Sequence, residues 1–226
     1  MTTNTPQNEL FLNYNDAVLY ESDMVLLDSP TAWLNDACIH FYQTVLAEQQ
    51  EEEQHRKLTF MDPSVVTFLM HQCDEEDLQD FSGSLDKECE MYVISINDGH
   101  ASSTAWRRPG GGSHWSLLVI LQDSAVYLHF DSVKGGNAVA AQAVATVFSN
   151  VLGHKKNNIL VTEVNTPQQQ NGFDCGLHAL GAAEVLVLGA SNIRSAKDAE
   201  LALTNSDLGR PGFALTLRTK IRTKAT

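Results

Sequence analysis

The stretch HWSLLVILQDSAVYLHFD, residues 114–131, decides the fold. Two runs rich in β-branched, aromatic and leucine residues flank Asp123-Ser124, a polar pair typical of a tight turn. The pattern predicts a β-hairpin, in which the beginning of the first strand lies beside the end of the second. His114 opens the first strand and Asp131 ends the second. We therefore expect these two side chains to be neighbours; the alternative for Asp131 is a simple turn former.

Further strands and helices are predicted on both sides of this hairpin. Residues 91–97 (MYVISIN) and 159–165 (ILVTEVN) are β-rich, and the first run ends in the turn sequence Asn97-Asp98-Gly99. Apolar periodicity predicts helices over 32–48 and 175–188. Capping residues add a helix from Asp62-Pro63 through Met70 and one over 137–152, with Asn137 as its cap and Gly153 as its stop. Residues 74–81 add another helical turn or two. The first of these helices carries Trp33, Ala37 and Phe41 on one stripe. Strands in the middle with helices before and after predict an α+β fold with a mixed central sheet flanked by helices.

Length and composition are those of an ordinary globular protein. The 226 residues favour one domain over residues 1–226, with about the first twelve residues and the last few frayed. Hydrophobic residues make up 43% and charged residues 19% of the chain. No apolar run reaches the roughly 20 residues that a membrane span needs, and the N-terminal sequence MTTNTPQNEL lacks the features of a secretory signal. We expect no membrane partner and a cytoplasmic or nuclear location.

Cysteine spacing and net charge narrow the chemistry. The four cysteines (Cys38, Cys73, Cys89 and Cys175) include no C-x-x-C pair and no zinc-finger spacing to a histidine, so we expect reduced thiols, no metal and no cofactor. A net charge of −13 argues against nucleic acid as a partner. The acidic runs at 48–53 and 74–77 are either a solvated face or a rim that attracts a basic substrate segment.

The segment PQQQNGFDCG, residues 167–176, holds the best candidate for a reactive group. A polar loop follows a predicted strand, and Cys175 stands where an apolar helix begins. A helix N-terminus lowers the pKa of a thiol from about 8.5 and offers N–H groups to an oxyanion. Gly176 is expected to let a substrate backbone approach closely. The alternative is a buried structural cysteine, which the polar, glycine-containing flank disfavours, so Cys175 is the candidate nucleophile.

A nucleophilic cysteine needs a base, and eight histidines compete for that role. His114 follows a glycine-rich loop and opens a strand, where its ring can face a cleft and Asp131 can fix its tautomer. His129 shares a strand face with Asp131 and is the best rival base, although a packed neighbour of the site is the favoured interpretation. His178 lies three residues after Cys175 in an apolar setting typical of core packing. Most of the remaining histidines are expected at the surface: His40, His55, His71, His100 and His154.

The glutamines before Cys175 offer an oxyanion donor in addition to the Cys175 backbone N–H. Gln169 lies six residues upstream of Cys175, and one donor of this kind is typically worth about 10²–10³ in rate. Gln168 and Gln170 are alternatives, and a glutamine run by itself is more typical of a solvated loop.

Four segments, in this order, resemble the ubiquitin-like-protein-specific cysteine proteases, the family of the SUMO (sentrin) proteases and the deneddylases. They are WLND at 33–36, GGSHWSLLV at 111–119, HFDS at 129–132 and QQNGFDCG at 169–176. The sequence from His114 to Asp131 spans 17 positions and that from Asp131 to Cys175 spans 44. The compact form and the closely spaced HWSLLVILQD and HFDS look most like the deneddylase branch, which acts on the ubiquitin-like modifier of cullins. The SUMO branch is the main competitor, and residues 106–109 and 190–207 depart from the family pattern.

The resemblance implies a papain-like α+β fold in one catalytic domain, with Cys175, His114 and Asp131 as catalytic residues and Gln169 beside them. It implies that a monomer, without a cofactor, hydrolyses the bond after the C-terminal Gly-Gly of a ubiquitin-like modifier. The partners would be the neddylation modifier or SUMO and the proteins conjugated to them. Two other functions are compatible with the same residues: a protein acyltransferase that uses the triad, and an inactive binder of a ubiquitin-like protein.

The resemblance also implies a substrate tunnel. Trp33 and Trp115 would cover the diglycine, because glycine alone fits beneath two indole rings. Asp36 would contact a basic residue of the tail. The alternatives are a core anchor of its helix for Trp33 and a solvated helix position for Asp36.

Overall fold

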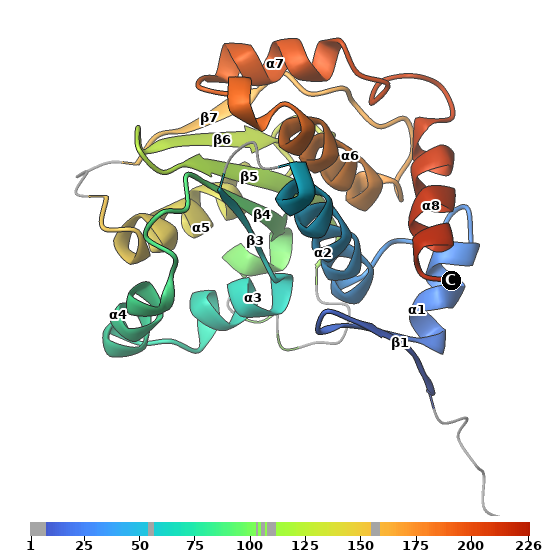
Figure 1. The fold of residues 1–226 in the computed structure, drawn as a ribbon, viewed down its shortest axis with the longest axis horizontal. Coiled ribbons are helices and arrows are strands. Elements are labelled where there is room, and N and C mark those ends of the chain that lie inside the picture. The colour runs from blue at the N-terminus through green and yellow to red at the C-terminus, as the bar shows by residue number, and fades with distance from the viewer. Residues whose placement is uncertain (1–7, 54–56, 103, 105–106, 108–111, 155–158) are drawn as a thin grey trace, which may run out of the picture.

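A mixed five-stranded sheet forms the centre of the molecule (Figure 1). The structure, a computed structural model, describes residues 8–53, 57–102, 104, 107, 112–154 and 159–226. In order across the sheet, the strands are β3 (Leu58–Met61), β4 (Met91–Asn97), β5 (Trp115–Leu121), β6 (Val126–Phe130) and β7 (Val161–Val164). The outer pairs β3–β4 and β6–β7 are parallel, whereas β4–β5 and β5–β6 are antiparallel. The predicted α+β class with a mixed central sheet is confirmed.

The predicted hairpin consists of strands β5 and β6. Leu117 pairs with Phe130 at its open end. Extending this register by one residue sets Asp131 opposite Ser116, so His114 is a diagonal neighbour of Asp131 on the same sheet face rather than its direct partner. Diagonal neighbours of this kind are within reach of a long side chain such as histidine.

Helices cover both faces of the sheet. Alternate residues of the central strands point to opposite faces, so Met91 and Val93 join one apolar cluster whereas Tyr92 and Ile94 join another. The helices α2 (Asp36–Glu53) and α6 (Cys175–Leu188) contribute to the first cluster, α3 (Pro63–His71) and α5 (Ala138–Val151) contribute to the second, and α4 (Glu75–Ser84) packs on α5. Covering both faces explains why β4 and β5 are mostly apolar and are buried along nearly their whole length. No helix in the described ranges has the length and apolar character that crossing a membrane requires.

The two ends of the chain form structure of their own. The strands β1 (Leu10–Tyr14) and β2 (Ala17–Tyr20) make a hairpin that leads into α1 (Glu21–Asp28), and α7 (Ala196–Thr204) and α8 (Phe213–Lys224) follow α6. Helix α8 packs against both α1 and α6 (Figure 1). The expectation of frayed ends is therefore wrong for residues 10–12, which pair in a hairpin, and for the last turn of α8; residues 1–7 lie outside the described residues.

The helix predicted over 32–48 begins later than expected. It is α2, which starts at Asp36 because the Asn35 side chain caps it by accepting a hydrogen bond from the Cys38 N–H at 3.0 Å. Trp33 therefore precedes the helix and does not share a stripe with its apolar residues. The start of α6 at Cys175 agrees with the prediction.

Candidate active site

Cys175 is the first residue of α6 and follows the loop that leaves β7. It is 2% exposed. Asn171 shapes the loop, because its side-chain oxygen accepts hydrogen bonds from the N–H groups of Phe173 at 3.1 Å and Asp174 at 3.0 Å. Asp174 makes no side-chain cap bond to α6. Its carboxylate therefore does not occupy the N–H groups that a helix start offers to an anion.

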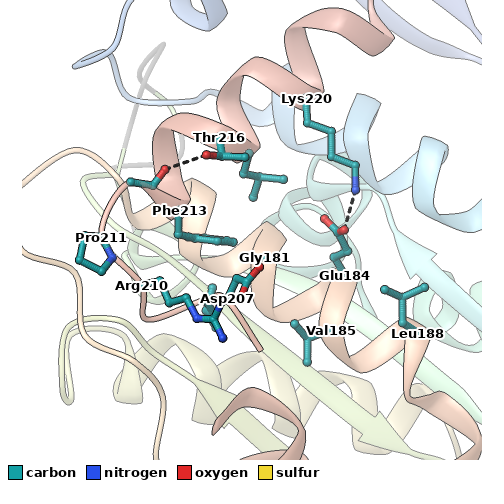
Figure 2. A pocket seen from close by; sticks show the side chains of 13 residues that line it. Gly181, Glu184, Val185, Leu188, Asp207, Arg210, Pro211, Phe213, Thr216 and Lys220 are labelled. Carbon is teal, nitrogen blue, oxygen red and sulfur yellow. Dashed lines mark hydrogen bonds and ion pairs between the residues drawn. The ribbon is translucent and has the colours of Figure 1, made fainter. Parts of the chain in front are cut away.

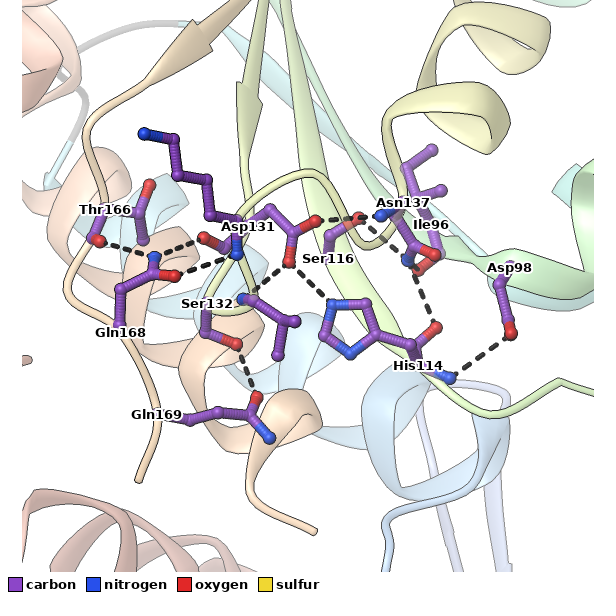
Figure 3. Close-up of polar contacts among 12 residues, drawn as sticks. Ile96, Asp98, His114, Ser116, Asp131, Ser132, Asn137, Thr166, Gln168 and Gln169 are labelled. Carbon is purple, nitrogen blue, oxygen red and sulfur yellow. Dashed lines mark hydrogen bonds and ion pairs between the residues drawn. The ribbon is translucent and has the colours of Figure 1, made fainter. Parts of the chain in front are cut away.

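His114 and Asp131 meet at the open end of the β5–β6 hairpin (Figure 3). The Nε2 atom of His114 lies 2.6 Å from Oδ1 of Asp131, and the ring also interacts with the Cys175 side chain. Burial lowers the pKa of His114, but the hydrogen bonds and charges of Asp131 and Cys175 outweigh burial and raise it to about 9. His114 therefore carries a proton at neutral pH, which it can transfer to a leaving group. The adjacency predicted from the hairpin is confirmed.

Asp131 is a buried carboxylate with several donors around it. It is 3% exposed, and its Oδ1 and Oδ2 atoms accept hydrogen bonds from the N–H groups of Val133 and Asn137, each at 2.9 Å. Burial raises the pKa of this carboxyl, but the hydrogen bonds from His114, Asn137 and Val133 hold it below its usual value. Asp131 is thus ionised and fixed in place, which suits a group that orients an imidazole and stabilises its positive charge.

Asn137 supports this pair in a way that the sequence did not predict. It was expected to cap α5, but its side chain makes no cap bond. The amide instead donates to the carbonyls of Ile96 and His114, each at 3.2 Å, and to Oγ of Ser116 at 3.0 Å (Figure 3). Because its backbone N–H also binds Asp131, Asn137 contacts both partners of the pair. The position of Asn137 just after the HFDS segment was only a weak sign of a role in the site, since helix capping alone explained an asparagine there.

Asp98 holds the backbone of the two residues that precede β5. It was predicted only as a turn residue after β4. Its carboxylate accepts hydrogen bonds from the N–H and Oγ of Ser113, each at 2.6 Å, and from the His114 N–H at 3.2 Å. Burial raises the pKa of Asp98, whereas these bonds hold it below its usual value. Gly112, the residue before Ser113, has a φ of 126°. A Cβ at this position would lie 1.8 Å from Oδ1 of Asn97. The position therefore requires glycine.

The three glutamines before Cys175 make different contacts. Oε1 of Gln169 accepts a hydrogen bond from Oγ of Ser132 at 2.7 Å, and its Nε2 donates to the Asn171 carbonyl at 2.6 Å. The side-chain nitrogens of the other two bond to backbone carbonyls: Gln168 to Asp131 and Thr166, and Gln170 to Gln168. Gln168 thus ties the loop to the end of the hairpin. The Nε2 of Gln169 carries two hydrogens, and its bond to Asn171 uses one of them, so the other can donate to an oxyanion.

The two tryptophans expected to cover the diglycine differ in exposure. Trp115 is 8% exposed and donates its Nε1–H to the Leu34 carbonyl at 2.9 Å, whereas Trp33 is 46% exposed. The alternative that Trp33 anchors a helix in the core is therefore wrong. Asp36 is exposed in the first turn of α2, where a carboxylate is favoured by the helix dipole.

Gly176 has a different role from the one expected. It is buried, and a Cβ there would lie 3.2 Å from Cβ of Leu34 and 3.5 Å from Cδ1 of Trp115. The missing side chain lets the segment around Trp33 and strand β5 pack closely on the start of α6. The expectation that it admits a substrate backbone is wrong, because protein atoms fill this space.

The rival histidines are engaged inside the protein. His129 is 0% exposed and lies between Glu163 and Ser116, while the His178 ring packs on the ring of Phe213 at a centroid distance of 5.9 Å. The expectation of a surface position is wrong for His100, which is 4% exposed. The sequence did not reveal this burial because His100 lies in the short 3-10 turn η1 (Asp98–Ala101), where no periodicity identifies the inner face. His55 lies outside the described residues.

Comparison with known families identifies the chain. A family model described as the Ulp1 protease family, C-terminal catalytic domain, matches residues 32–210. This chain belongs to the Ulp1 protease family. It is accordingly a cysteine protease, and the resemblance inferred from its motifs is confirmed. The match includes residues 190–207, which had no counterpart in the motif comparison and form a 3-10 turn and α7. Of the residues 106–109, the structure describes Arg107.

Individual relatives agree with this assignment. Sentrin-specific protease 8 of Homo sapiens is 35% identical over 176 residues, covering 77% of this chain and 80% of the relative. NEDD8-specific protease 1 of Arabidopsis thaliana is 30% identical over 184 residues, covering 81% of this chain and 77% of the relative. The crystal structure of a de-sumoylating protease is similar with a TM-score of 0.65 at 16% identity, covering 97% of this chain and 92% of that one. At that identity the likeness concerns the fold, which is that of Ulp1-like proteases.

Proposed function

We propose that this protease hydrolyses the bond after the C-terminal Gly-Gly of a ubiquitin-like modifier, and that NEDD8 is its preferred modifier. The observation that carries the proposal is the line of contacts from Asp131 through His114 to Cys175 at the start of α6. Relatives named as NEDD8-specific and sentrin-specific proteases support the choice of modifier. Precursor processing and isopeptide cleavage would use this one site.

In the proposed reaction, the Cys175 sulfur attacks the carbonyl carbon of the terminal glycine. The C–N bond breaks, and His114 transfers its proton to the departing amine. The resulting thioester is attacked by water, which gives a proton back to His114 and releases the modifier with a free carboxylate. Asp131 keeps the imidazole oriented and stabilises its charged form. The Cys175 N–H and the second N–H of Gln169 Nε2 stabilise the oxyanion in both steps.

The tail of the modifier is proposed to pass between the two tryptophans. Trp115 lines the buried side next to Gly176, and the exposed indole of Trp33 covers the other side. Residues with side chains would not fit such a passage, which makes glycine the selected residue. Asp36, exposed at the start of α2, is proposed to attract a basic residue of the tail.

We also propose the domain organisation, the oligomeric state and the location of the enzyme. We take residues 1–226 as one catalytic domain that acts as a monomer in the cytoplasm or nucleus. All four cysteines are free thiols, which accords with a reducing compartment.

Electrophilic probes test the choice of modifier. NEDD8, SUMO and ubiquitin, each with a C-terminal electrophile, are incubated with the enzyme at equal concentrations. We expect the NEDD8 probe to label Cys175 fastest; faster labelling by the SUMO probe would assign the enzyme to the SUMO branch, and no labelling by any probe would favour an inactive binder or an acyltransferase. Acetyl-CoA in place of the probes then tests the acyltransferase.

The Cys175→Ala variant tests the nucleophile. It should lose hydrolysis of a NEDD8–coumarin conjugate but still bind NEDD8, because the alanine removes only the sulfur. Retained hydrolysis would disprove the role of Cys175. The matched control is Cys73→Ala, since Cys73 lies beyond the end of α3 and outside the site.

A further inference from the structure

Arg218 is a buried cation that the proposed chemistry leaves unexplained. It belongs to α8, which begins beyond Arg210, the last residue that the family model matches. The residue is 2% exposed. A buried guanidinium is costly unless acceptors and an opposite charge surround it. Its contacts therefore indicate what this residue does.

The guanidinium joins three segments that are distant in sequence. One terminal nitrogen, Nη1, donates to the Leu26 carbonyl in α1, and the other, Nη2, donates to the Ala32 carbonyl, each at 2.7 Å. The Nη2 atom also lies 3.8 Å from Oδ1 of Asp174, the residue before Cys175. A planar, forked group can reach these acceptors together, whereas the single ammonium of a lysine cannot reproduce the geometry.

The contact with Ala32 holds one side of Trp33. On its other side, the Leu34 carbonyl accepts the hydrogen bond from Nε1 of Trp115 at 2.9 Å. Two buried donors thus hold the backbone on both sides of Trp33, while Trp33 itself is 46% exposed. A side chain on a backbone held in this way is presented to a ligand in a restricted set of orientations.

Helix α8 is in turn fixed to α6, the helix that begins with Cys175. Figure 2 shows the pocket along this junction, where Phe213 lies beside Gly181 and Lys220 points to Glu184. A Cβ on Gly181 would come within 2.2 Å of the Phe213 ring, and Nζ of Lys220 lies 2.6 Å from Oε1 of Glu184. Arg218 therefore reaches the segment around Trp33 from a helix that is anchored on the Cys175 helix.

We propose that Arg218 is a positioning residue that sets the spacing between the Trp33 indole and Cys175. The inference rests on the proposed function, in which Trp33 covers the diglycine. Arg218 contacts the backbone beside Trp33 and the carboxylate beside Cys175, so it links the two parts of the site that must hold the tail. Displacement of a bound group by about 1 Å can cost about 10²-fold in rate.

The Arg218→Lys variant tests this role, because it keeps the positive charge and removes the fork. We expect kcat/KM for a NEDD8–coumarin conjugate to fall about 10- to 100-fold. Alkylation of Cys175 by iodoacetamide, which needs no tail, should keep the wild-type rate. The control is Arg222→Lys on the next turn of α8, where Nε of Arg222 lies 2.6 Å from Oδ1 of Asp28 at the surface; its kcat/KM should be unchanged. An unchanged kcat/KM in Arg218→Lys, or an equal fall in alkylation, would overturn the proposal.

A double-mutant cycle asks whether Arg218 acts through Trp33. If it does, Trp33→Ala lowers kcat/KM, and adding Arg218→Lys to it causes little further loss, because the two changes remove the same interaction. If the fold-loss in kcat/KM of the double variant equals the product of the two single fold-losses, the inference is contradicted. A wild-type enzyme that reacts with no diglycine-ended probe would instead contradict the proposed function, so the two failures are distinguishable.

A measurement on the wild-type protein covers the case in which Arg218→Lys does not fold. The guanidinium N–H signals of ¹⁵N-labelled enzyme are assigned to Arg218 and followed by NMR during titration with NEDD8. We expect slowly exchanging signals that shift with NEDD8 and not with NEDD8 lacking its last two glycines. If the chemical shifts of the Arg218 guanidinium do not change when NEDD8 with its intact tail is added, the inference is overturned.

Discussion

Two histidines of the β5–β6 hairpin each contact a carboxylate, His114 through Nε2 and His129 through Nδ1, and the two pairs differ most in access. The nitrogen–oxygen distance is 2.6 Å in both His114–Asp131 and His129–Glu163. Nε2 of His129 also lies 2.8 Å from Oγ of Ser116, so the second group repeats the carboxylate–imidazole–hydroxyl order of a serine protease triad. Yet His129 is 0% and Ser116 1% exposed. The His114 side chain, by contrast, is 13% exposed, so His114 can pass a proton to a bound substrate whereas the enclosed His129 cannot. The order of groups alone therefore does not make an active site.

The carboxylates of the two pairs also differ in their surroundings. The Asp131 side chain is 1% exposed, whereas the Glu163 side chain is 48% exposed. Water screens an exposed ion pair strongly and a buried one weakly. The His114–Asp131 pair should therefore respond far more than the His129–Glu163 pair to the same chemical change.

The largest difference is expected between Asp131→Asn and Glu163→Gln, which make the same change in the two pairs. Asp131→Asn should lower kcat by about 10⁴-fold, because the wrong imidazole tautomer is favoured. Glu163→Gln should leave kcat nearly unchanged. Hydrolysis of a NEDD8–coumarin conjugate measures both, and comparable losses would mean that the two pairs form one functional unit.

Asn137→Ala removes the side chain that lies between the two pairs. We expect kcat/KM to fall about 10- to 100-fold, because the His114 carbonyl loses a donor and the imidazole moves. Loss of the buried hydrogen bonds should also lower the free energy of unfolding by about 1–3 kcal/mol. Asn150→Ala, at the exposed end of α5, is the control for both measurements. Unchanged kinetics with lowered stability would restrict Asn137 to a structural role.

The charge of His114 gives a pH prediction with a definite sign. Its pKa is raised to about 9 in the folded protein, against about 6.5 in an unfolded chain. The charged histidine therefore stabilises the fold fully below about pH 6.5, and this contribution is lost as the pH rises toward 9. The free energies of unfolding of wild type and His114→Asn, measured by urea unfolding, should differ most at the low-pH end of this window.

NMR titration separates the causes of that raised pKa. Cys175→Ala removes one of the two groups that raise it, so the His114 ring should titrate at a lower pH than in wild type. An unchanged titration would show that Asp131 alone sets the pKa.

The smallest effect on activity is expected for Ser116→Ala. The hydroxyl joins His129 to Asn137 but touches no substrate, so kcat/KM should stay near the wild-type value. The free energy of unfolding should fall by about 1 kcal/mol, the usual worth of a hydrogen bond. A large loss of activity would mean that Ser116 belongs to the catalytic machinery after all.

The sequence predicted the elements that local patterns define. The hairpin followed from two β-rich runs around a turn, and the start of α6 from a polar loop before an apolar helix. It missed the start of α2, because the apolar stripe from Trp33 extends before Asn35, the residue that caps the helix. It also missed α8 and the β1–β2 hairpin. Both are short amphipathic segments whose burial depends on contacts with distant parts of the chain.

The sequence by itself determined the chemistry of this protein: Cys175 at a helix start, and His114 and Asp131 at the two ends of one hairpin. These residues are placed by strand pairing and by the loop that Asn171 shapes before α6, which act over short stretches of chain. The tertiary structure alone decided that His129 is enclosed, that Asn137 and Asp98 hold His114, and that Arg218 binds the Ala32 carbonyl beside Trp33. Those contacts join residues whose meeting depends on sheet register and helix packing, and no local pattern encodes them.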